Sequence, residues 1–212
     1  MRGTRTALAS VLLLPALACG GSTSPSPQPS PTPCAKPTSP YGVSVVEWWI
    51  PSSSLAQNIY NNPQDAVGAP DAAGFGPLNY TGFVSLGFGG HVTLDLGGCV
   101  ADQPGDDIRV YQSVSNEPLS VYVSKSPDGP FTLLKPFFQD CGNRVPGTSN
   151  VQKFCDFDLA SAGVAETRYV RVEDAEIYPC PCGTPSEGAD LDAVQALAIS
   201  GTIGSADSPG PR

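Results

Sequence analysis

The sequence predicts an all-β fold, an antiparallel β-sandwich of the jelly-roll type. Three observations lead to this prediction. Short alternating or β-branched runs recur along the chain, clusters of Gly, Pro, Asn and Asp separate them, and no segment has the periodicity of an amphipathic helix. Regularly spaced strands with turn signals between them are typical of sandwiches rather than of helical or mixed folds.

Eight segments are expected to form strands. In residues 119–124, Leu119, Val121 and Val123 alternate with polar or amphipathic residues, which predicts one buried face and one solvated face. Residues 160–166 are expected to make no more than one helical turn. The predicted strands are 43–50, 82–86, 91–96, 107–112, 119–124, 131–134, 168–173 and 193–200.

The first 18 residues have the pattern of a signal peptide. Arg2 and Arg5 precede a short apolar stretch, and small residues flank the junction before Cys19. The run Ala-Leu-Ala-Cys-Gly at 16–20 resembles the lipobox of bacterial lipoproteins, in which the cysteine carries the lipid. This resemblance implies export and a lipid anchor at Cys19, with the outer membrane or cell surface as the expected location. Lipoboxes usually have Leu where this chain has Ala16, and secretion with cleavage near Ala18 remains the alternative.

Residues 19–40 are expected to form a tether. They consist almost entirely of Gly, Ser, Thr and Pro, with repeated Ser-Pro and Thr-Pro steps, a composition that cannot pack a core. The β-sandwich domain is then expected at 41–203, and a disordered tail at 204–212. A lipid followed by a tether would hold this domain away from a surface.

The cysteine content fits an oxidising compartment. Seven cysteines less the lipidated one leave six, which predicts three disulfides with fifteen possible pairings. The hairpin-like separation of Cys141 and Cys155 favours that pair first. The pair at 180 and 182 lacks the CxxC spacing and a nearby His, so two structural bridges are preferred over a metal or redox site. Cys34 and Cys99 are then expected to pair with Cys180 and Cys182.

The chain is acidic, which excludes some partners. The formal net charge of −9 becomes −11 when Arg2 and Arg5 leave with the signal peptide. An acidic domain is a poor match for nucleic acid or for an anionic membrane surface, whereas a divalent cation is a natural counter-ion.

Six stretches together resemble a family of bacterial extracellular domains with a galactose-binding-like jelly roll, distantly similar to discoidin and coagulation-factor C-type modules. The first reads Asn-Pro-Gln-Asp-Ala-Val-Gly-Ala-Pro-Asp, and the last reads Asp-Leu-Asp-Ala-Val-Gln-Ala-Leu. Their order covers nearly the whole domain. The stretches are 62–71, 84–96, 104–111, 121–124, 168–172 and 190–197.

The resemblance implies a structural calcium ion between an early loop and the strand near the C-terminus. By position, Ala66 would offer its backbone carbonyl, Asp71 and Asp192 their carboxylates, and Asp190 a further oxygen, which suits a cation that prefers oxygen ligands. The loop departs from the discoidin pattern, which usually has an Asp-Gly pair followed by Thr and Trp. The alternative is that Asp71 and Asp192 serve as turn or cap residues, and for Asp106 and Asp107 that reading is preferred.

No catalytic constellation is found, and we predict that the protein is not an enzyme. The single histidine, His91, begins a predicted strand without a nucleophile motif, so a half-exposed strand-edge residue is the better interpretation. Paired acids for glycoside hydrolysis cannot be singled out.

Trp48 and Trp49 are the candidate ligand platform. Sugars dock on flat aromatic faces, but adjacent strand residues point to opposite sides, so we expect at most one ring to be buried and the other to be exposed. Packing remains the alternative role. The leading hypothesis is a cell-surface lipoprotein that displays a binding or adhesion module for a glycan or a protein. The alternatives are a structural or assembly envelope lipoprotein without a sugar ligand and, after it, a glycoside hydrolase.

Overall fold

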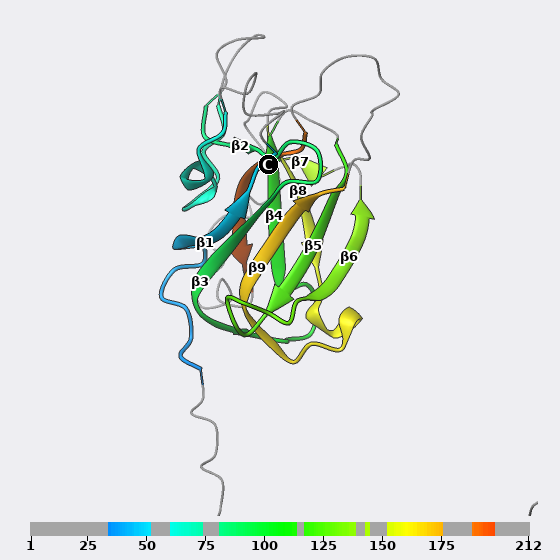
Figure 1. Cartoon of the computed structure of the whole chain (residues 1–212). Coiled ribbons are helices and arrows are strands. Elements are labelled where there is room, and N and C mark those ends of the chain that lie inside the picture. The colour runs from blue at the N-terminus through cyan, green and yellow to red at the C-terminus, as the bar shows by residue number, and fades with distance from the viewer. Residues whose placement is uncertain are drawn as a thin grey trace, which may run out of the picture. The chain divides into compact units, whose positions relative to one another are not determined.

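Two antiparallel five-stranded sheets face each other in the computed structural model (Figure 1). The first sheet has the order β1-β3-β9-β5-β6 and the second β2-β10-β4-β8-β7. The structure describes residues 34–51, 60–73, 81–113, 117–138, 143–144, 152–175 and 188–197. The predicted all-β antiparallel sandwich is confirmed.

The described residues contain only strands and two short 3-10 helices as regular elements. The strands are β1 Ser44–Trp49, β2 Val84–Ser85, β3 His91–Ala101, β4 Ile108–Ser113, β5 Leu119–Ser124, β6 Thr132–Phe138, β7 Asn143–Arg144, β8 Gln152–Phe157, β9 Glu166–Asp174 and β10 Asp190–Ala196. The 3-10 helices are η1 Pro63–Ala66 and η2 Leu159–Ala162, and the second overlaps residues 160–166, where a single turn was expected.

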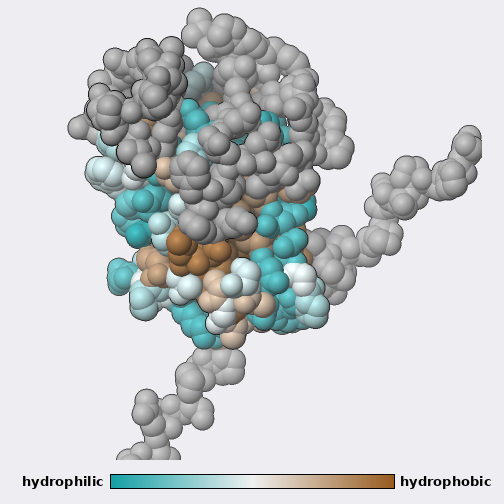
Figure 2. Space-filling view, turned by 90° about the vertical axis from the view of Figure 1, so that its right-hand side faces the viewer, coloured by the Kyte–Doolittle hydropathy of each residue, from teal (hydrophilic) through white to brown (hydrophobic). Residues whose placement is uncertain are grey.

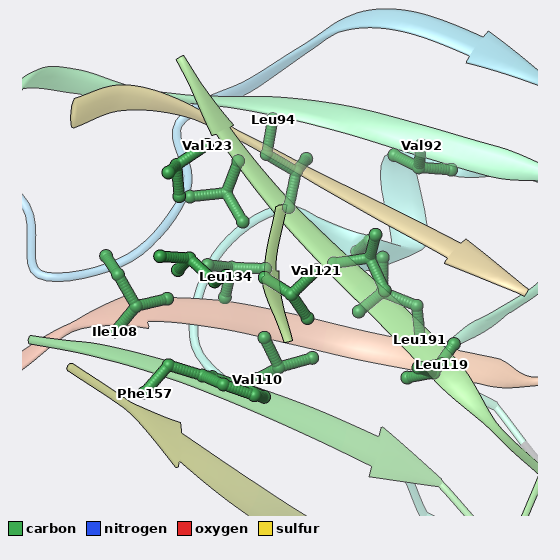
Figure 3. Packing of buried hydrophobic residues seen from close by; sticks show 14 of the residues in the cluster. Val92, Leu94, Ile108, Val110, Leu119, Val121, Val123, Leu134, Phe157 and Leu191 are labelled. Carbon is green, nitrogen blue, oxygen red and sulfur yellow. The ribbon is translucent and has the colours of Figure 1, made fainter. Parts of the chain in front are cut away.

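The core lies between the two sheets. Val92 and Val121 of the first sheet point toward Val110 and Leu191 of the second, and all four side chains are fully buried (Figure 3). Burying a side chain of this size contributes roughly 1.5–3 kcal/mol. The inward side chains alternate with outward ones, so the buried strands fix which residues face solvent.

Strand limits differ from the prediction where polar residues interrupt the apolar pattern. β8 was missed because Lys153 and Asp156 hide the alternation of Cys155 and Phe157, which both point into the core. β10 begins at Asp190 rather than at 193, because its two aspartates are buried and hydrogen-bonded instead of lying in a turn.

The predicted pairing of Cys34 and Cys99 with the cysteines at 180 and 182 is wrong. Cys34 is bonded to Cys99, with a Cα–Cα distance of 5.5 Å. The physical reason is that the segment after Cys34 lies along β3, where the Cys99 N–H donates to the Ala35 carbonyl at 2.7 Å. Cys155 is also disulfide-bonded. The expected partner Cys141, like Cys180 and Cys182, lies outside the described residues.

Residues 1–33 and 198–212 lie outside the described residues. The signal peptide, the lipidation site Cys19, most of the tether and the tail therefore remain predictions. Within the described part of the chain, no helix has the length and apolar character needed to cross a membrane.

Candidate functional site

A row of outward-facing side chains crosses the first sheet near one end. The register of β1 and β3 sets Trp49 opposite His91 and Glu47 opposite Thr93, and the register of β3 and β9 sets Thr93 opposite Arg171. Residues opposite each other share a face, and this face points outward because the residues between them are buried.

The polar members of this row form one hydrogen-bonded network. The Glu47 carboxylate accepts from Thr93 Oγ1 at 3.1 Å and from Arg171 Nη2 at 2.9 Å, and His91 Nε2 lies 2.8 and 2.9 Å from its two oxygens. Arg171 Nε in turn donates to Thr93 Oγ1 at 3.0 Å. Burial acts to raise the pKa of Glu47, but His91 and Arg171 outweigh it and hold the pKa below its usual value.

Aromatic rings flank the network on both sides. The Trp49 ring centroid lies 6.2 Å from that of His91, and the Phe131 ring lies 4.2 Å from Arg171 Cζ. Such a contact between a guanidinium group and an aromatic face is attractive and fixes the orientation of the cation. We call Glu47, Trp49, His91, Thr93, Phe131 and Arg171 the sheet-face site.

Both tryptophans are about half exposed, 48% for Trp48 and 53% for Trp49. They point to opposite sides of β1, as the alternation predicts, and neither ring is buried. The reason is that β1 is the edge strand of its sheet, so Trp48, opposite Val92, lies at the margin of the core and not within it.

Of the sheet-face site, sequence reasoning proposed only Trp49. It interpreted His91 as a half-exposed strand-edge residue and did not consider the other four members. Glu47 shares a face with Trp49 because it lies two residues away, and Thr93 is related to His91 in the same way. That spacing is a usable signal. Arg171 and Phe131 carried no signal in the sequence, because only the order of strands across the sheet brings them to Thr93.

The structure brings together two of the predicted calcium ligands, Asp71 and Asp192. The Asp192 side chain is buried, and its Oδ1 accepts the N–H groups of Asp71 at 3.0 Å and of Ala72 at 3.3 Å. Its Oδ2 accepts Gln152 Nε2 at 3.1 Å. Hydrogen bonds thus join the early loop to β10, at the place where the ion was expected.

The other two predicted ligands lie close by in the chain but have separate surroundings. Ala66 is fully buried in η1, which packs against β10. Asp190 accepts a hydrogen bond from the Ser85 hydroxyl of β2, so one of its oxygens is engaged away from the loop.

The acidic surroundings of Asp192 suit a cation. Burial first, and the charge of Asp71 in addition, raise the pKa of Asp192 to about 7. Burial and the charge of Asp71 also raise the pKa of Asp65. The oxygen ligands available here fit calcium in part. Oδ1 of Asp192 already accepts two N–H groups and Oδ2 accepts one, so Oδ2 has more capacity left for an ion. Asp71 supplies a second carboxylate.

A second acidic group lies at the opposite end of the sandwich. The carboxylates of Asp102, Asp107 and Asp158 have oxygens within 4.8 Å of one another. Asp107 is fully buried and accepts the N–H groups of Gln103 at 3.0 Å and Leu159 at 3.1 Å. Asp107 therefore bonds to loop N–H groups as a cap residue does, but it is buried and not solvated as the turn-and-cap interpretation expects.

An open groove of about 470 Å³ lies at this same end, between the β5–β6 turn and residues 163–166. Its lining contains no aromatic ring, and its charged pair, Lys125 and Glu166, is joined at 2.7 Å. The groove is a separate feature from the exposed tryptophans, since neither Trp48 nor Trp49 lines it.

On the β6 side of the molecule, apolar surface gathers in the middle of the described part with hydrophilic residues around it (Figure 2).

No protein-family model matches the chain, and no curated protein matches it. Among solved structures, the CBM32 of AlyQ in complex with 4,5-unsaturated mannuronic acid is similar at 13% identity and a TM-score of 0.39, covering 72% of this chain and 96% of that one. A CBM32 of Clostridium perfringens in complex with glcNAc-alpha-1,4-galactose is similar at 10% identity and a TM-score of 0.39, covering 74% and 90%.

Truncated AlyQ with CBM32 and alginate lyase domains is also similar, at 14% identity and a TM-score of 0.38. That match covers 80% of this chain but 35% of the longer one. All three of these similar chains are, or contain, CBM32 domains.

Proposed function

We propose that the protein is a non-catalytic module that binds a neutral glycan at the sheet-face site. The observation that carries this proposal is the exposed ring of Trp49 beside a hydrogen-bonded network of Glu47, His91, Thr93 and Arg171. A sugar ring has an apolar C–H face that stacks on an aromatic ring and hydroxyl groups that exchange hydrogen bonds with polar neighbours. The site offers both kinds of contact on one surface.

The network is arranged before any ligand arrives. Arg171 is held by Glu47, by Thr93 and by the ring of Phe131, so its free N–H groups keep a fixed direction. Rigid donors lose little conformational entropy on binding, which favours affinity. Strand residues hold such groups more firmly than loop residues do.

The charge of the site favours neutral sugars over uronic or other acidic sugars. Glu47 already neutralises Arg171, and the chain as a whole carries a formal charge of −9. A carboxylate on the ligand would meet no unpaired cation in this network and would be repelled by the rest of the domain.

We propose further that the module is displayed on the cell envelope through a lipid at Cys19 and stabilised by calcium near Asp71 and Asp192. The lipobox-like junction and the Pro/Ser/Thr tether support the anchor. The raised pKa values of Asp65 and Asp192, two buried or partly buried acids that feel the charge of Asp71, support a cation there.

Titration of neutral glycans and matched acidic glycans into the purified protein tests the glycan site. We expect wild-type protein to bind neutral members, and Trp49→Ala to weaken binding about tenfold or more, which corresponds to about 1.4 kcal/mol. Trp48→Ala is the matched control, because Trp48 is equally exposed but lies on the other side of β1, and we expect less than a twofold change.

Wild-type binding confined to acidic glycans would contradict the proposed ligand class. Equal losses in the two tryptophan variants would contradict the proposed site. Absence of binding to every glycan would favour the alternative of a protein partner, for which the exposed Val46, on the same strand as the tryptophans, adds apolar surface.

A further inference from the structure

The tether enters the domain at β3 and not only at the first strand. Cys34, which follows the Pro/Ser/Thr segment directly, is bonded to Cys99 in β3. The Cys99 N–H also donates to the carbonyl of Ala35 at 2.7 Å. The end of the tether is therefore attached to β3 by a covalent bond and by a backbone hydrogen bond.

Two glycines of β3 make room for this attachment. A Cβ atom at Gly98 would lie 2.5 Å from both the Ala35 carbonyl oxygen and the Pro37 nitrogen, which is closer than atoms can approach. Gly97 has a φ of +73° and lies against Val43. Between Asp95 and Val100, the pairing of β3 with β9 is interrupted, so this stretch of β3 can accept residues 35–37.

The attachment changes the route that a pulling force takes into the sandwich. Along the backbone alone, force on the tether would first reach residues 40–42, which are bonded to β10 through the Pro40 carbonyl and the Gly42 N–H. It would then reach β1, an edge strand that pairs only with β3 among the described strands. An edge strand pulled from its end separates one hydrogen bond at a time. Force that enters at Cys99 meets β9 instead of β1. The next two residues of β3, Val100 and Ala101, pair with Thr167 and Glu166 of β9, which lies inside the sheet.

We propose that the Cys34–Cys99 disulfide is a mechanical clamp, which passes tension on the tether into β3 and spares the chain between the two cysteines. The bond spans 65 positions of sequence, and the enclosed segment contains β1, Trp49 and His91. Part of the sheet-face site and the Asp71 loop would therefore keep their structure under load. The source of the tension rests on the proposed surface display, but the clamp can be tested without any ligand.

Single-molecule force spectroscopy on the mature chain, held by the N-terminal end of its tether and by its C-terminus, tests the clamp. We compare oxidised wild-type protein with Cys34→Ser/Cys99→Ser. In the variant we expect an early release at low force, of about 5 nm, as some 15 residues from 35 to the end of β1 detach, first from β10 at residues 40–42 and then from β3. Oxidised wild-type protein should lack this event and begin to unfold at a higher force.

Full unfolding of the variant should also extend about 22 nm further, because the enclosed 65 positions become extensible. That extra length reports only that the cross-link is gone. The force of the first event decides the proposal: a first event at the same force in both proteins would overturn it, and so would an early 5 nm release in oxidised wild-type protein.

A second measurement covers the case in which the double variant does not fold. Oxidised wild-type protein is folded first, held at a force below its unfolding force, and then exposed to a reducing agent. We expect the early 5 nm step to arise only after reduction, and its length distinguishes β1 from segments released by reduction at Cys155. No such step after complete reduction of Cys34 and Cys99 would overturn the clamp.

Discussion

At the scale of single residues, Asp192 shows how a buried carboxylate can organise a loop. Its two oxygens accept three N–H groups, two from the backbone at Asp71 and Ala72 and one from Gln152. Burial and the charge of Asp71 nevertheless raise its pKa to about 7. The side chain therefore stabilises the loop through its hydrogen bonds, but its ionised form is disfavoured by burial in the folded protein.

In metal-free protein, this penalty on ionisation predicts that stability falls as the pH rises from about 4 to about 7. The unfolded chain releases the Asp192 proton near its ordinary pKa of about 3.9, whereas the folded chain keeps the proton until about 7. Within that window the free energy of unfolding should fall by up to about 1.4 kcal/mol per pH unit from this group. Urea unfolding at several pH values, in the presence of a chelator, measures the slope.

Asp192→Asn should flatten this slope, because the amide cannot ionise but can still accept from the loop N–H groups. Asp106→Asn, at an exposed position, removes the same charge and should leave the slope unchanged. Equal slopes in wild-type protein and in Asp192→Asn would show that Asp192 does not titrate in this window.

With calcium bound, ionised Asp192 should stabilise the folded protein instead of destabilising it. A cation near Asp71 and Asp192 favours the ionised carboxylate, and binding to the folded state stabilises it by about 2.7 kcal/mol when free calcium is a hundred times Kd. Adding a chelator should then lower the Tm of wild-type protein by several degrees and that of Asp71→Ala by much less. Identical melting curves with calcium and with chelator, at equal ionic strength, would show that calcium does not stabilise the folded protein.

At the scale of elements, register brings the sheet-face site together. Residues two apart on a strand share a face, a rule that could have related Glu47 to Trp49 although the sequence analysis did not apply it there. The sequence could not predict that β9 lies beside β3, because strand order depends on long-range packing, and so Arg171 was not connected with His91. The disulfide partner of Cys34 was missed for the same reason.

Elements were predicted well where apolar residues alternate and poorly where buried polar residues replace them. β5 and most of β1 agree with the predicted limits, since their inward positions are Val or Leu. β10 was placed too late because Asp190 and Asp192 resemble a turn in the sequence. Their burial becomes understandable only once Ser85, Gln152 and the Asp71 loop are seen to supply donors.

The contact of residues 35–37 with β3 leads to a prediction for Gly98. A side chain there would push residues 35–37 off the strand, so Gly98→Val should lower the free energy of unfolding by about 1–3 kcal/mol. Ala101→Val, at an exposed position of the same strand, is the control for added volume and β-propensity. Chemical unfolding of both variants checks this, and a loss in Gly98→Val no larger than that in the control would contradict the proposed contact.

At the scale of the whole molecule, the Cys34–Cys99 bond should make a large contribution to stability. Closing a loop of 65 positions restricts the unfolded chain, which the loop-entropy relation values at about 4 kcal/mol. Guanidinium unfolding of Cys34→Ser/Cys99→Ser should show a loss approaching this value. A loss below about 1 kcal/mol would mean that the unfolded state is already restricted in some other way.

The two ends of the strand-bearing region lie side by side. Ala196 at the end of β10 donates its N–H to the Pro40 carbonyl at 2.6 Å, and Tyr41 pairs with Gln195. A domain whose ends meet can be placed within a surface loop of another protein without separating the flanks of that loop, and its chain can be circularly permuted by joining the old ends and opening a turn elsewhere. The sandwich therefore has the geometry of a transferable insert, suited to recombination between multidomain proteins and to engineered display.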